Sequence, residues 1–202
     1  MFKNLFKREE QKPVNKKVVV VSGLPRSGTS MMMKMLAEGG LSTVVDNLRE
    51  ADEDNPNGYF EIEDVKALKD GQNKWIYDAR GKVVKVISYL LEFLPADLTY
   101  DVIFMDREIH EVLASQKKML ARRNEVSTIS DEDMEKQYRE HLKAVKYWLP
   151  RQANIRVKYV KYNEMVKSPE TLVPSLIEFL ELPLNAEAMK AVPNPSLYRN
   201  RA

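Results

Sequence analysis

Hydrophobic runs recur along the chain, separated by longer amphipathic stretches. Runs rich in β-branched and aromatic residues, bounded by turn-forming residues, predict buried strands of a parallel sheet. The last run alternates as IRVKYVKY, so we expect it nearer an edge of the sheet. The predicted strands occupy residues 18–21, 82–87, 100–105 and 155–162, and a further short strand could lie at 43–46.

The stretches between these runs have the spacing of amphipathic helices. Gly39 and Gly40 favour a helix end, Pro95 closes another helix, and Ser130 followed by three acidic residues favours a helix start. Strands that alternate with helices predict an α/β fold, a three-layer α/β/α sandwich with a mostly parallel sheet, whose ligands bind at the carboxyl ends of the strands. The helices are expected at 29–38, 61–69, 90–94, 109–123, 131–149, 169–182 and 186–192.

The composition indicates one globular domain. With 202 residues, 44% hydrophobic and 31% charged, the chain can bury a core and keep a well-hydrated surface. We expect the domain at 17–202, after a flexible lead-in at 1–16 with too few apolar residues for a signal or membrane-spanning segment. These features favour a cytoplasmic protein without a membrane partner.

Charge and cysteine usage exclude several classes of function. The 32 basic and 30 acidic residues give a net charge of +2, which argues against a nucleic acid partner and leaves room for a local basic pocket. The sequence has no cysteine, so disulfides, thiolate metal sites and cysteine nucleophiles are excluded.

The strongest chemical signal is the loop GLPRSGTS at 23–30, between the first strand and the first helix. This arrangement presents backbone N–H groups at a helix N-terminus to an anion such as phosphate. Gly23 and Gly28 have the spacing of a nucleotide P-loop, but Thr29 stands where a kinase-type lysine is expected. Arg26 supplies a planar, permanently charged group instead. The sequence therefore predicts a fold of the P-loop nucleotide-binding type without the kinase lysine.

Three stretches resemble the sulfotransferase family. PRSGTS is similar to the family's 5′-phosphosulfate loop, and its arginine resembles the tyrosylprotein branch and many bacterial sulfotransferase-like proteins. Arg107 and Ser115, across a strand-to-helix junction, are similar to the pair that grips the 3′-phosphate of 3′-phosphoadenosine 5′-phosphosulfate in the family. VKYNEMVKSPETLVPSLIEFLELP resembles the family's strand, tyrosine and following helix, so the resemblance covers about residues 17–183.

The resemblance implies 3′-phosphoadenosine 5′-phosphosulfate as the sulfate donor and no metal ion. The sequence departs from the family pattern at two points. No proline follows Arg107, and the glycine- and lysine-rich C-terminal segment of cytosolic members is not found. Tyr198 and Arg199 could cover the 3′-phosphate instead. The donor-binding residues that the resemblance implies are Gly23, Pro25, Arg26, Ser27, Gly28, Thr29, Ser30, Arg107 and Ser115. Tyr198 and Arg199 are further candidates from the tail, where the sequence departs from the family.

Catalysis of sulfuryl transfer depends mostly on placement and electrostatics, because the in-line transition state is loose. Arg26 is the candidate that stabilises the leaving phosphate, and Lys85, or the nearby Lys82, is the candidate that contacts the transferred group. Asp46 and Glu50 are candidate bases, because a buried carboxyl with a raised pKa can take a proton from the acceptor. The tyrosylprotein branch likewise has a glutamate about twenty residues beyond the loop arginine.

The acceptor and the oligomeric state are not fixed by the sequence. We expect a small-molecule or peptide acceptor with a hydroxyl or amine group, in a pocket shaped by the loop at 54–61. His110 and His141 lie in predicted helices, and we expect both at the surface. The helix at 131–149 could serve a homodimer.

Two alternative functions stay open. YDVIFMD resembles a Walker B strand with Asp106 as a magnesium residue, which suggests an ATP-dependent kinase. Thr29 and the spacing of Arg107 and Ser115 argue against that reading. The other alternative is a catalytically silent nucleotide-binding protein of the same fold.

Overall fold

A parallel sheet forms the centre of the molecule. In the computed structural model, which describes residues 17–46, 58–125 and 127–195, four strands lie in the order β2-β1-β3-β4, and every neighbouring pair is parallel. This confirms the predicted α/β fold. The strands are β1 (Val18–Gly23), β2 (Val83–Lys85), β3 (Tyr100–Asp106) and β4 (Ile155–Lys161).

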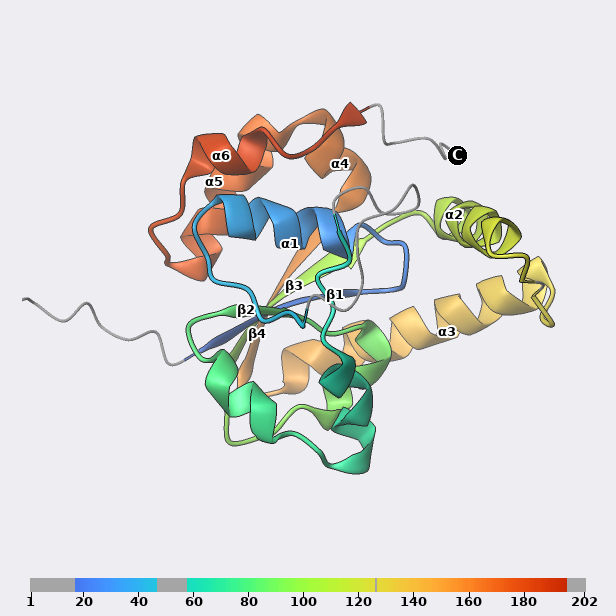
Figure 1. Cartoon of the computed structure of the whole chain (residues 1–202), viewed down its shortest axis with the longest axis horizontal. Helices are drawn as coiled ribbons and strands as arrows, with labels where there is room; N and C mark the ends of the chain where they lie inside the picture. Colours follow the sequence, from blue (N-terminus) through green and yellow to red (C-terminus); the bar gives the residue numbers. More distant parts are fainter. Residues whose placement is uncertain (1–16, 47–57, 126, 196–202) are drawn as a thin grey trace, which may run out of the picture.

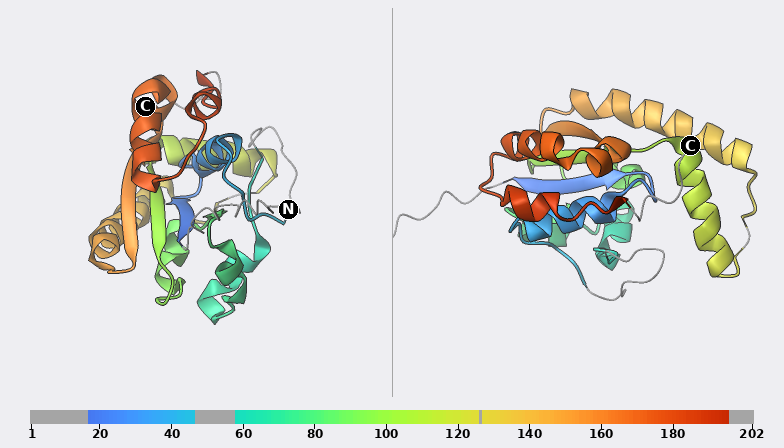
Figure 2. Two further views of the ribbon diagram at one scale, coloured as in Figure 1. Left: turned by 90° about the vertical axis from the view of Figure 1, so that its left-hand side faces the viewer. Right: turned by 90° about the horizontal axis from the view of Figure 1, so that it is seen from above.

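Helices cover both faces of this sheet and complete the three layers (Figures 1 and 2). One face carries α1 (Thr29–Glu38), α4 (Tyr162–Lys167), α5 (Pro169–Leu180) and α6 (Ala186–Lys190). The other carries α3 (Asp131–Trp148) and the 3₁₀ helices η1 (Glu63–Asp70), η2 (Lys74–Ala79) and η3 (Ser88–Phe93). The chain also forms α2 (Ile109–Arg122) and η4 (Leu149–Arg151).

The side chains of β1 divide the hydrophobic core in two. Because neighbouring strand residues point to opposite faces, Val19 and Val21 pack under the methionine-rich α1, while Val18 and Val20 pack under α3 and the 3₁₀ helices. All residues of β1 are buried, as expected for a central parallel strand. β4 is an edge strand and is less buried than β1 and β3, which confirms the expectation that it lies nearer an edge of the sheet.

Three local predictions need correction. Residues 43–46 form no strand: Thr43 makes a single bridge to Val83, after which the Asp46 N–H donates to the Glu61 carbonyl and the chain leaves the sheet. The helices expected near 61–69 and 90–94 are 3₁₀ helices. Tyr162 begins α4 instead of ending the last strand.

The predicted cap of α3 is confirmed, because the Ser130 hydroxyl accepts from the Asp133 N–H at 3.1 Å.

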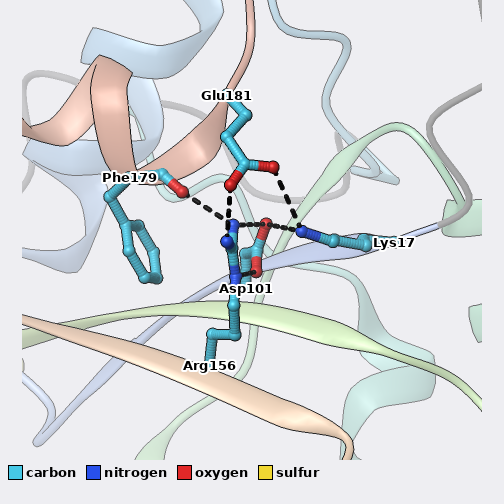
Figure 3. Close-up of polar contacts among 5 residues, drawn as sticks. All are labelled: Lys17, Asp101, Arg156, Phe179 and Glu181. Atoms are coloured by element: carbon cyan, nitrogen blue, oxygen red, sulfur yellow. Dashed lines mark hydrogen bonds and ion pairs between the residues drawn. The ribbon is translucent and has the colours of Figure 1, made fainter.

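An ion network around the buried Asp101 ties α5 to the amino ends of the strands, at the opposite edge from the loop (Figure 3). Asp101 is fully buried and accepts two hydrogen bonds from Arg156, at 2.7 and 2.9 Å. Arg156 also donates to the Phe179 carbonyl and pairs with Glu181, while Lys17 lies near both carboxylates. The network therefore joins β1, β3 and β4 to the C-terminal end of α5.

Within the described residues, no helix is both long and apolar enough to cross a membrane.

Candidate functional site

The loop between β1 and α1 depends on two glycines. Gly28 has φ +99°, and a side chain there would place its Cβ 2.3 Å from the Tyr162 ring. Gly23 has φ +145°, and its Cβ would meet the Ser27 hydroxyl at 2.5 Å and the Met105 carbonyl at 2.6 Å. Both positions combine a conformation that L side chains rarely adopt with close contacts. The glycine spacing in the sequence therefore reflects tight packing of the loop against β3 and α4.

The loop leads directly into the N-terminus of α1, where the first N–H groups have no carbonyl partner within the helix. Thr29 and Ser27 are buried, Ser30 is half-buried, and Pro25 is exposed. The Ser27 hydroxyl has no hydrogen-bond partner among the described residues. A buried hydroxyl without a partner is costly unless a ligand satisfies it. These donors fit an anion held at the end of α1.

Arg26 links this loop to the second predicted phosphate motif. It adopts φ +70°, and its Nε donates to the Ser115 hydroxyl on α2 at 3.0 Å. The Arg107 guanidinium in turn donates to the Arg26 carbonyl at 3.1 Å. The structure therefore brings together three residues that the sequence predicts for donor binding, although Ser115 lies far along the chain.

Arg107 is held in place from several sides. Its Nε donates to the buried carboxylate of Glu111 at 2.9 Å, and its guanidinium lies 4.3 Å from the centre of the Tyr162 ring. Asn163 donates to the other Glu111 oxygen at 3.4 Å. Burial raises the pKa of the Tyr162 hydroxyl, while Arg107 and Arg26 lower it, so both cations act on this ring. This packing fixes the guanidinium at the carboxyl end of β3.

Lys85 lies on the other side of the loop, at the carboxyl end of β2. Its side chain is 6% exposed, and Nζ donates to the Tyr59 carbonyl, to Glu61 at 3.1 Å and to the Ser30 hydroxyl at 3.4 Å. The neighbouring Lys82 is exposed. Of the two candidate lysines, Lys85 is therefore the one that the structure places against the loop.

The predicted bases have different outcomes. The Asp46 carboxylate accepts from the Glu63 N–H at 2.6 Å and so caps the first turn of η1. Glu50 lies outside the described residues, as do Tyr198 and Arg199. Asp46 is therefore engaged by the backbone, and its role as a base stays a prediction.

One histidine lies where the sequence did not indicate. His141 is half-buried, its Nε2 is 2.8 Å from the Ser88 hydroxyl, and its ring stacks on Tyr89 at 3.6 Å between centres. Burial lowers the pKa of its imidazole. The expectation of a surface position is therefore wrong for His141, while His110 is largely exposed as expected. No local pattern signals the contact, because Ser88 and His141 lie on elements distant in sequence.

Neither the residues at this edge nor the rest of the described chain offer a group of three His, Asp or Glu side chains suited to a metal ion. Asp106, the magnesium residue of the kinase alternative, pairs with Lys146 at 2.7 Å.

The sheet is parallel, and a glycine-bounded loop follows its central strand β1, with a lysine on one side and an arginine on the other. This arrangement is typical of α/β proteins that bind an anionic ligand at the carboxyl ends of the strands. A family model described as the sulfotransferase family matches residues 62–186, more than half of the chain. The chain therefore belongs to the sulfotransferase family. The match includes Lys85, Arg107 and Ser115 and begins after the loop at 23–30.

Solved structures agree with this fold. The sulfotransferase domain of the Synechococcus PCC 7002 olefin synthase has a TM-score of 0.55 and 18% identity, over 95% of this chain and 86% of that one. A sulfotransferase from Alicyclobacillus acidocaldarius has a TM-score of 0.50 and 15% identity, over 91% and 89%. A comparison with curated protein sequences finds no significant match.

Proposed function

We propose that this sulfotransferase moves a sulfuryl group from 3′-phosphoadenosine 5′-phosphosulfate to a hydroxyl or amine acceptor, without a metal ion. The observation that carries the proposal is the contact between Arg26 and Ser115, which joins the loop at 23–30 to the Arg107 segment. A donor with two separate phosphate groups needs two anion sites at a fixed separation. The two motifs meet at one edge of the sheet, and this supports such a donor.

The residues divide into roles by position. The N–H groups at the start of α1, with the hydroxyls of Thr29 and Ser30, are suited to bind the 5′-phosphate. Arg26 is suited to stabilise the negative charge that develops on this phosphate as the sulfur–oxygen bond breaks. Arg107 and Ser115 are suited to the 3′-phosphate. Lys85, whose ammonium lies 3.4 Å from the Ser30 hydroxyl, is suited to the sulfuryl oxygens.

Several finer points of this proposal come from the sequence. The arginine form of the loop suggests likeness to the tyrosylprotein branch, and a peptide acceptor is one candidate beside small molecules. A cytoplasmic location and a homodimer stay predictions. The family match does not favour the kinase alternative.

Calorimetry tests the donor site. Wild type should bind adenosine 3′,5′-bisphosphate and prefer it to Mg-ATP, and Arg107→Ala should weaken bisphosphate binding about 10- to 100-fold, as expected for the loss of a charge-assisted hydrogen bond. Adenosine 5′-monophosphate should bind both proteins alike, because it lacks the group that Arg107 is proposed to hold. Arg139→Ala, which removes an exposed arginine of α3, is the matched control and should change neither affinity.

A preference for Mg-ATP, or bisphosphate binding that is indifferent to Arg107, would overturn the proposed donor. Transfer itself is tested with radiolabelled donor and a panel of phenols, sugars, amines and peptides. Arg26→Ala should abolish this transfer, and full turnover in that variant would contradict the role given to Arg26.

A further inference from the structure

The Glu61 carboxylate lies beside Lys85, the residue suited to the sulfuryl oxygens. Its Oε1 lies 3.1 Å from Lys85 Nζ, and Lys85 in turn contacts the loop hydroxyl of Ser30. The side chain of Glu61 is 44% exposed, whereas that of Lys85 is 6% exposed. Glu61 therefore links the buried ammonium to the solvent, from which an acceptor must approach.

The contacts of Lys85 fix the relative positions of these groups. An ammonium has three N–H donors. Lys85 Nζ donates to the Tyr59 carbonyl, to the Glu61 carboxylate and to the Ser30 hydroxyl on the loop. If the ammonium holds a sulfuryl oxygen on its loop side, the Glu61 carboxylate lies next to the same sulfuryl group. A carboxylate has two oxygens and about four lone-pair sites, so a carboxylate that pairs with an ammonium can still take up a proton.

We infer that Glu61 is the general base of the transfer, an assignment that rests on the proposed function. As the acceptor oxygen or nitrogen attacks sulfur, its proton passes to the Glu61 carboxylate. The new bond to sulfur forms while the bond from sulfur to the 5′-phosphate oxygen breaks, and its electron pair stays on that phosphate beside Arg26. Lys85 neutralises the sulfuryl oxygens and keeps the carboxylate in position.

Two other candidate bases are less suited. The Asp46 carboxylate accepts a backbone hydrogen bond at 2.6 Å at the start of η1, a structural role that a proton would weaken. His141 contacts Ser88 and Tyr89, which both lie on η3. Glu61, by contrast, contacts Lys85, and Lys85 contacts the Ser30 hydroxyl of the loop at 23–30.

The test compares Glu61→Gln with Glu63→Gln, which removes an exposed carboxylate two residues away that pairs with Lys66. His141→Asn tests the rival base. Transfer is measured with radiolabelled donor and acceptors of graded acidity, phenols from phenol to 4-nitrophenol and alcohols from ethanol to trifluoroethanol. Calorimetry with adenosine 3′,5′-bisphosphate follows the donor site in each variant.

Glu61→Gln should keep bisphosphate affinity and lower turnover with the least acidic acceptors about 100-fold or more. The loss should shrink as the acceptor becomes more acidic, because an ionised acceptor needs no base. Glu63→Gln should behave as wild type. An equal loss with every acceptor would instead assign Glu61 to the positioning of Lys85 and overturn the inference. So would unchanged turnover, or an acidity-dependent loss in His141→Asn alone. If wild type fails to bind the bisphosphate or transfers to no acceptor, the proposed function falls first and takes this inference with it.

Discussion

Replacing Arg156 by methionine should destabilise the fold by about 3 kcal/mol, because the change strands a buried charge. Asp101 is 0% exposed and loses two hydrogen bonds, at 2.7 and 2.9 Å. The remaining cation is Lys17, whose Nζ lies 3.4 Å from the carboxylate. Breaking a buried pair from one side costs about 3–5 kcal/mol, and the lower end applies because the Arg156 side chain is 41% exposed and partly screened by water.

Urea unfolding followed by circular dichroism measures this change as a free energy of unfolding. Adding Asp101→Asn to Arg156→Met removes the stranded charge, so the double variant should recover about 1 kcal/mol relative to Arg156→Met. Lys161→Met, which removes an exposed cation from the same strand, is the control and should leave stability nearly unchanged. The reasoning is refuted if Arg156→Met is as stable as this control, or if Asp101→Asn adds its full cost to that of Arg156→Met.

Two further predictions concern the loop and the histidine. Gly28→Ala should lower the free energy of unfolding by about 1–3 kcal/mol in thermal melts, because φ +99° is strained for alanine and the new Cβ meets the Tyr162 ring. In a protein that already carries Tyr162→Ala, Gly28→Ala should cost less, because the clash with the ring is gone and only the backbone strain stays. His141→Asn should flatten the acid side of the stability profile. Burial lowers the pKa of this imidazole in the folded state below its ordinary value of 6.5, so wild type loses stability as the pH falls below 6.5. The free energy of unfolding, measured at about pH 5 and about pH 7.5, should therefore differ less in the variant than in wild type. An equal difference in the two proteins would contradict the prediction.

The strands and the loop could be predicted because their signals are local. A continuous run of valines forms a strand only where both faces are covered, and the glycine pair marks a turn that no other residue adopts without strain. The boundary errors fall where local and long-range demands differ. Residues 43–45 have β-branched side chains, but the backbone hydrogen bond from Asp46 goes to Glu61 and not to β2.

The partners of the site residues could not be predicted in the same way. Arg26 and Ser115 were each expected at the donor site, yet their direct contact depends on the relative placement of the loop and α2. The contact between Lys85 and Glu61 likewise depends on how residues 58–61 return to the end of β2. His141 has no motif around it, and its burial arises only when α3 packs beside η3. Sequence patterns indicate which chemistry is present, whereas tertiary packing decides which groups meet.

The strand order gives the proposed donor a direction. β1 lies between β2 and β3, so Lys85 and Arg107 stand on opposite sides of the loop that follows β1. A donor whose 5′-phosphate lies at the loop must then extend its adenosine 3′-phosphate toward β3 and its sulfuryl group toward β2. The acceptor consequently has to arrive on the β2 side, where Glu61 lies exposed beside Lys85. Substitutions around Glu61 should therefore alter acceptor choice, while those around Arg107 should alter donor affinity, and a transfer assay over several acceptors separates the two effects.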